Sequence, residues 1–179
     1  MEIYKEIKKT TWRGAKVRKI IKFLERYQYI VGQPNFPIRD ISNELYYEKR
    51  TMEVSYYGTN LAIEVVISYI KKVFEREKYS KREFKNKIFS GAKVVSLLEF
   101  LDFKIYNAKE NIEQLQSKHN KLLSISENRE IFLKYWEAQL ETLLKMKKWI
   151  LFGITQVKQE IDEEDDWIES VIYEADSDD

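Results

Sequence analysis

The sequence contains no cysteine, one histidine, two prolines and five glycines. Without cysteine, the chain can form neither a disulfide framework nor a thiolate metal site. The absence of cysteine also excludes Cys–His catalysis, and a single histidine excludes any metal site that needs two histidines from one chain. We therefore predict no catalytic residue, no bound metal and no cofactor, and we interpret the chain as a protein that is not an enzyme.

Long apolar runs are also missing. The longest is WILFGI, residues 149–154, which is far too short to span a bilayer. The N-terminal residues MEIYKEIKK contain no apolar signal core. With 44% apolar and 14% aromatic residues, the 179-residue chain nevertheless has enough side chains to build a core. We expect a folded cytoplasmic protein without a membrane segment.

Charge is distributed unevenly along the chain. Residues 1–150 contain 30 Lys and Arg against 19 Asp and Glu, whereas residues 151–179 contain one Lys against 11 Asp and Glu. A basic body with an acidic end is a pattern that favours interaction with nucleic acid or with charged protein surfaces. We divide the chain into a basic N-terminal portion (1–87), a helical hairpin (88–161) and an acidic tail (162–179).

Apolar residues recur at helical spacing through most of the chain. Two heptad seams, from Val94 to Leu122 and from Leu133 to Ile161, are each sustained for about four repeats and flank a polar break at residues 124–128. We predict a mainly α-helical fold, in which a basic N-terminal helical portion packs on a long antiparallel helical hairpin. The width of the apolar faces, together with the coiled-coil pattern, leads us to expect a homo-oligomer, most simply a homodimer.

Residues 50–69 can be interpreted in two ways. Met52, Val54 and Tyr56 alternate with the more polar residues at positions 53, 55 and 57, and apolar residues alternate again over 63–69. The intervening Gly58-Thr59-Asn60 suits a three-residue hairpin loop. We favour a β-hairpin here, with a helix as the alternative.

A four-residue string, GAKV, occurs at 14–17 and again at 91–94. From each glycine onward, six of eleven positions are identical and two more exchange Ile for Leu. Neither copy has the further glycines of a phosphate-binding loop. We interpret the two copies as starts of apolar-periodic helices that share a structural solution, with an old duplication as the alternative.

The stretch FPIRDISNELYYEKRTMEV, residues 36–54, resembles the helix-turn-helix of bacterial transcription regulators. That pattern runs Ile-Ala-x-x-Leu and then Thr-Val after about five residues; Ile41, Ser42, Leu45, Thr51 and Met52 stand at the matching places. The heptad pair after it is similar to the dimerising helices of PadR-type winged-helix regulators. The resemblance implies that Thr51 caps a recognition helix.

The favoured function is therefore a DNA-binding transcription regulator with a helical dimerisation region. The alternative is a non-enzymatic helical adaptor or assembly subunit that binds a protein or a ribonucleoprotein. Cations and aromatic residues are interleaved in the first predicted helix, which suits phosphate contact and base stacking as well as a merely solvated face. The candidate nucleic-acid contacts are Lys9, Arg13, Lys16, Arg18, Lys19, Arg39, Lys49, Arg50 and Thr51.

The acidic tail contains apolar residues that would share one face of a helix. These candidate partner-binding residues are Trp167, Ile168, Val171 and Ile172. Such a face could dock on an outside protein, or it could fold back on the basic body and compete there with nucleic acid.

Deleting residues 160–179 should tighten nonspecific binding of DNA or RNA and steepen its dependence on salt, because more phosphates would then be contacted. Fluorescence anisotropy on a random duplex at several salt concentrations, with full-length and truncated protein, measures both effects. Equal affinities and equal slopes would contradict competition by the tail.

Overall fold

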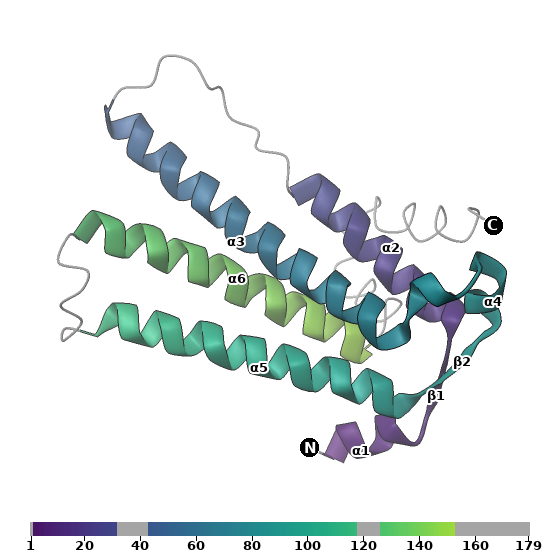
Figure 1. Cartoon of the computed structure of the whole chain (residues 1–179). Helices are drawn as coiled ribbons and strands as arrows, with labels where there is room; N and C mark the ends of the chain where they lie inside the picture. Colours follow the sequence, from purple (N-terminus) through teal and green to yellow (C-terminus); the bar gives the residue numbers. More distant parts are fainter. Residues whose placement is uncertain (1, 32–42, 118–125, 153–179) are drawn as a thin grey trace.

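The computed structural model describes residues 2–31, 43–117 and 126–152, and these residues are mainly helical, as predicted. The first half of the chain contains α1 (Glu2–Lys8), β1 (Thr11–Arg13), α2 (Gly14–Val31) and α3 (Asn43–Phe74). The second half contains a short 3₁₀ helix, η1 (Arg76–Lys78), followed by α4 (Lys81–Asn86), β2 (Ile88–Ser90), α5 (Gly91–Gln116) and α6 (Ser126–Phe152). The four long helices lie alongside one another, and β1 and β2 form a ribbon at one end (Figure 1).

The predicted hairpin over residues 50–69 is wrong, because these residues belong to the single 32-residue helix α3. Its buried residues follow the helical period rather than the period of two: Ala62, Ile63, Val66, Ile67, Ile70 and Phe74. This stripe packs against α6, α2 and α5. The β-strand propensity of the β-branched and tyrosine residues is therefore outweighed by the burial of one continuous apolar face of the helix.

The predicted antiparallel pair in the second half of the chain is formed by α5 and α6, which pack against each other (Figure 1). Most seam positions of α5 in the described range are buried, including Val94, Leu98, Leu101 and Ile105. These residues contribute to a core that the same chain supplies from α2 and α3. The homo-oligomer stays a prediction.

The two GAKV strings occupy equivalent places in the structure. Each follows one strand of the ribbon directly and opens a long helix, α2 at Gly14 and α5 at Gly91. The strands pair antiparallel, with Trp12 opposite Phe89 at the centre, and these residues are separated by the same 77 positions as Gly14 and Gly91.

Equivalent hydrogen bonds join the two halves across the ribbon. The amide of Gly14 donates to the carbonyl of Lys87 over 2.7 Å, and the amide of Gly91 donates to the carbonyl of Thr10 over 2.9 Å. The short helices are exchanged in the same way, since α1 packs on α5 and α4 packs on α2. Both strings therefore start helices, as predicted, and their matched surroundings favour the duplication that the sequence left as an alternative.

Both glycines stand where the backbone of the other half comes very close. A Cβ atom at Gly14 would lie 1.5 Å from the carbonyl oxygen of Phe84, and one at Gly91 would lie 1.9 Å from that of Ile7. Phe84 and Ile7 are again equivalent positions. The close approach lets each short helix end against the first turn of the long helix from the other half.

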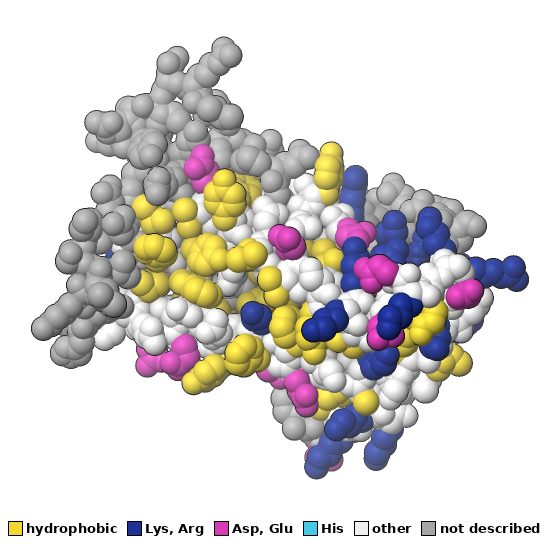
Figure 2. All heavy atoms as spheres, viewed as in Figure 1, with side chains coloured by type: hydrophobic (Ala, Val, Ile, Leu, Met, Phe, Trp, Pro, Cys, Tyr) yellow, Lys and Arg dark blue, Asp and Glu magenta, His cyan; other side chains and the backbone are white. Residues whose placement is uncertain are grey.

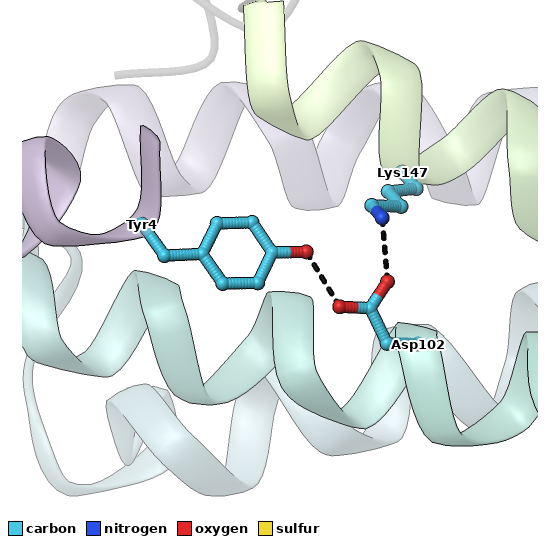
Figure 3. A network of polar contacts seen from close by, with 3 residues as sticks. All are labelled: Tyr4, Asp102 and Lys147. Carbon is cyan, nitrogen blue, oxygen red and sulfur yellow. Dashed lines mark hydrogen bonds and ion pairs between the residues drawn. The ribbon is translucent and has the colours of Figure 1, made fainter. Parts of the chain in front are cut away.

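A partly buried polar contact ties α1 to the helical pair (Figure 3). The Tyr4 hydroxyl donates to Asp102 Oδ2 on α5 over 2.6 Å, and Lys147 Nζ on α6 lies 2.5 Å from Asp102 Oδ1. An ion pair at the corresponding place in the first half joins Lys71 to Glu25 over 3.0 Å. Each acidic residue lies one position after the Phe-Leu pair that the two repeats share.

Burial raises the pKa of the Tyr4 hydroxyl, and its hydrogen bond to Asp102 raises that pKa further. Burial lowers the pKa of Lys147, but the hydrogen bonds and the charge of Asp102 outweigh it, so the pKa of Lys147 is raised. Both groups are therefore protonated at neutral pH. Their contribution to stability is complete below their unfolded values and is lost as the pH rises through the raised pKa values.

Substituting Gly14→Ala or Gly91→Ala should each lower the free energy of unfolding by at least about 2 kcal/mol, because a buried backbone contact has to move. Urea unfolding followed by circular dichroism measures the change. Ala92→Ser, on the exposed residue beside Gly91, is the control and should change stability by less than about 0.5 kcal/mol. If both glycine variants were as stable as the wild type, the close approach of the opposite backbone to these glycines would be contradicted.

Substituting Tyr4→Phe should lower the free energy of unfolding by about 1–2 kcal/mol at pH 7, since Asp102 loses a hydrogen bond. The difference between wild type and variant should shrink above about pH 10, where Tyr4 and Lys147 lose their protons. Urea titrations from pH 7 to pH 11 measure both effects. A difference that stayed constant over that range would show that these groups are not linked to folding.

Candidate nucleic-acid interface

Lysine and arginine gather at the end of the molecule where the ribbon and α4 lie. Residues 8–22 contain seven Lys and Arg and no Asp or Glu, and residues 76–87 contain six Lys and Arg against two Glu. Figure 2 shows this concentration at the right of the view, with apolar side chains gathered toward the opposite end. We call residues 8–22 and 76–90 together the basic end.

The ribbon positions the side chains of the basic end by strand alternation. Trp12 and its partner Phe89 share the inner face, where Phe89 is buried and Trp12 is partly buried against the core. Arg13 and its partner Ile88 share the outer face, and both are exposed. Ile88 is 64% exposed, which is unusual for a branched apolar residue surrounded by cations.

Two lysines of the basic end lie over aromatic rings. Lys16 Nζ lies 4.4 Å from the centre of the Trp12 ring, and Lys87 Nζ lies 5.0 Å from the centre of the Tyr79 ring. Both lysines are exposed, while both rings are partly buried. One face of each ring is thus directed toward solvent and holds a cation.

Three of the residues predicted to contact nucleic acid are brought together here. Lys9, Arg13 and Lys16 are exposed between the end of α1 and the first turn of α2. Lys19 is partly buried on the next turn of α2. The predicted nucleic-acid contact at Arg18 is corrected, because only 3% of this residue is exposed and it belongs to the interior face of α2.

The remaining predicted contacts do not join the basic end. Arg39 lies outside the described residues, as do the predicted partner-binding residues Trp167, Ile168, Val171 and Ile172. Lys49, Arg50 and Thr51 lie within α3, which runs without a break from Asn43. The helix-turn-helix pattern needs a turn before Thr51, and the continuous helix has none, so Thr51 caps nothing and instead lines a cleft.

Sequence reasoning missed the contribution of residues 76–87. The charge pattern KREFKNK was visible, but it lies about 60 positions from the first basic cluster. The pairing of β1 with β2 and the packing of α4 on α2 bring the two segments together. The equivalence of the two GAKV strings was the signal that could have predicted this pairing.

A second feature is a cleft of about 570 Å³ between α2, α3 and α6. Its walls combine two tyrosines, Tyr27 and Tyr56, with hydroxyl groups on α3 and two carboxylates on α6, Glu137 and Glu141. Each carboxylate is paired along its helix, Glu137 with Lys134 over 3.6 Å and Glu141 with Lys145 over 3.4 Å. A cleft of this size and mixed lining suits a small polar molecule with an aromatic ring.

Within residues 2–31, 43–117 and 126–152, no helix is long and apolar enough to cross a membrane. The same residues include no group of three or more His, Asp or Glu side chains that could hold a metal ion.

Comparison with known proteins gives one class of relative. The chain is 26% identical over 162 residues to proteins named tRNA (guanine-N(7)-)-methyltransferase from Clostridium botulinum strains Hall and Langeland. The alignment covers 75% of this chain and 74% of each relative. No family model matches the chain. No solved structure matches it either.

This similarity overturns the function predicted from the sequence. A DNA-binding transcription regulator and a non-enzymatic adaptor both conflict with relatives that are named as tRNA methyltransferases. The interpretation of the chain as a non-enzyme is contradicted for the same reason. The error came from giving weight to a short pattern around Thr51 and from treating the shortage of His and Cys as a sign of no catalysis, although group transfer does not require either residue.

Proposed function

We propose that this protein binds tRNA through its basic end and acts in the methylation of guanine in that RNA. The observation that carries the proposal is the similarity to tRNA (guanine-N(7)-)-methyltransferases, which extends over three-quarters of the chain. The basic end supports it independently, because it places exposed cations and aromatic rings on one surface. Cations supply affinity for phosphates, and aromatic rings supply contacts to bases.

The electrostatic part of this binding follows from the position of the cations. Arg13, Lys16 and Lys87 are exposed around the ribbon, and the ribbon is held by backbone hydrogen bonds to both long helices. Their side chains can therefore meet a phosphate chain without a change in the fold. Each phosphate contact that forms releases a counterion, so the affinity should fall steeply with salt.

Methylation also needs a methyl donor, which supplies an electrophilic methyl group when it is bound. The described residues form no parallel sheet, so a donor bound by them has to sit between helices. The cleft between α2, α3 and α6 fits such a molecule in size and chemistry. Tyr27 and Tyr56 can contact a heterocyclic ring, while Glu137 and Glu141 can accept hydrogen bonds from hydroxyl or ammonium groups.

Replacing Arg13→Gln and Lys87→Gln together should weaken tRNA binding about tenfold and reduce the slope of affinity against salt by about 1.5 to 2. Filter binding or anisotropy with unmodified tRNA measures both quantities. The matched control is Lys109→Gln with Lys148→Gln, which removes the same charge from exposed residues of α5 and α6 that belong neither to the basic end nor to the cleft.

Methyl transfer is tested with unmodified tRNA and S-adenosylmethionine carrying a labelled methyl group. We expect label in guanine, and we expect Glu141→Gln to raise the donor concentration needed for half-maximal rate. A protein that bound tRNA no better than a DNA duplex of equal length, and that transferred no label, would contradict the proposed function.

A further inference from the structure

We propose that the basic end holds unpaired RNA nucleotides, with one base stacked on Trp12 and another on Tyr79, whereas a duplex contacts only its cations. This inference rests on the proposed RNA binding and names the form of RNA that the site accepts. Three observations on the basic end carry it: the two lysine-covered rings, the aromatic row that supports Tyr79, and the exposed Ile88 on the outer face of the ribbon.

The first ring, Trp12, has one face fixed and one face open to a ligand. It packs against the core on the inner side of the ribbon, at the centre of the strand pairing. The exposed Lys16, in the first turn of α2, lies over the ring at 4.4 Å. A base can replace the ammonium group on this ring, because the lysine side chain is long and can turn to a neighbouring phosphate.

The second ring, Tyr79, repeats this arrangement from another segment. Tyr79 ends η1 in an extended conformation, and the exposed Lys87 lies 5.0 Å from its ring centre. The Tyr79 ring is tilted against Phe84 at 6.4 Å, and Phe84 is in turn 5.5 Å from Phe89. Because Phe84 and Phe89 are buried, this row fixes Tyr79 relative to the ribbon.

The outer face of the ribbon, on the rung next to Trp12, is apolar as well as basic. Arg13 and Ile88 form one rung of the ribbon, and the backbone carbonyl of Lys87 is bonded to Gly14 at its edge. Phosphate binding alone gives no reason for an isoleucine that is 64% exposed at this place. Contact with the flat face or edge of an unpaired base explains the exposed isoleucine, since bases are the apolar part of a nucleotide.

A duplex cannot use these features. Its bases are already stacked on one another, and the major groove of an A-form RNA helix is too deep and narrow for side chains to reach base edges. Only the cations of the basic end would contact a duplex. The aromatic rings should therefore distinguish unpaired from paired RNA, while the cations contribute to both.

The test uses four variants of the full chain. Trp12→Leu and Tyr79→Leu keep an apolar side chain against the core but remove the aromatic face, whereas Trp12→Phe and Tyr79→Phe keep it. Anisotropy is measured with unstructured oligouridine, with the same strand carrying abasic positions, and with an RNA duplex of equal length. Thermal melting by circular dichroism establishes that each variant is folded.

We expect each leucine variant to weaken binding of oligouridine about tenfold and to change duplex binding less than about twofold. The slope against salt should stay unchanged, because no phosphate contact is lost. The phenylalanine variants should bind as the wild type does, and abasic positions should remove the difference between wild type and leucine variants.

Two results would overturn the inference while leaving tRNA binding intact: leucine variants that bind oligouridine normally, or losses that are equal for the duplex and the single strand. Failure of the wild type to bind any of these RNAs would overturn the proposed function together with the inference. If Trp12→Leu unfolds the chain, the Tyr79 pair and the abasic strands decide the question, since they leave the ribbon intact.

Discussion

The pairing of β1 with β2 is the constraint on which the other contacts of the fold depend. Only three residues of each strand take part, yet the pairing fixes where α2 and α5 begin and which way they run. The amides of Gly14 and Gly91, each bonded to a carbonyl of the other half, leave no room for a side chain at either helix start. The exchanged packing of α1 on α5 and of α4 on α2 follows from these two positions.

The helices of the second half could be predicted from the sequence, because their apolar residues keep one period over many turns and the structure buries that stripe. The helix over residues 50–69 could not be predicted, because alternating β-branched residues and a glycine satisfy the local pattern of a hairpin as well as that of a helix. The helix is decided by the burial of Ile63, Val66 and Ile70, which form one stripe that packs with α6 and α2 as partners. The candidate site was half predicted: the cations around Lys9, Arg13 and Lys16 were found, but those near Lys87 are joined to them only by long-range pairing.

The two repeats keep their interior and differ on their surface. Positions 17, 20, 21 and 24 of α2 and the equivalent positions of α5 are all buried and apolar. The outward positions have diverged: Lys19, Lys22 and Arg26 of α2 correspond to Ser96, Glu99 and Phe103 of α5. A shared interior with unequal surfaces is the expected result when one copy of a repeat keeps a structural role and the other acquires a charged ligand.

The exchange of short helices also has a consequence for how the chain folds as it is made. The partner of β1 is 77 residues further on, and the helix that covers α1 ends only at Gln116. At a synthesis rate of about 5–20 residues per second, α1 and α2 must wait several seconds for their partners to be made. Until α5 is made, α1 has no native cover, while α2 can already pack on α3. The uncovered apolar side of α1 makes the nascent first half a stage at which this protein needs protection from aggregation.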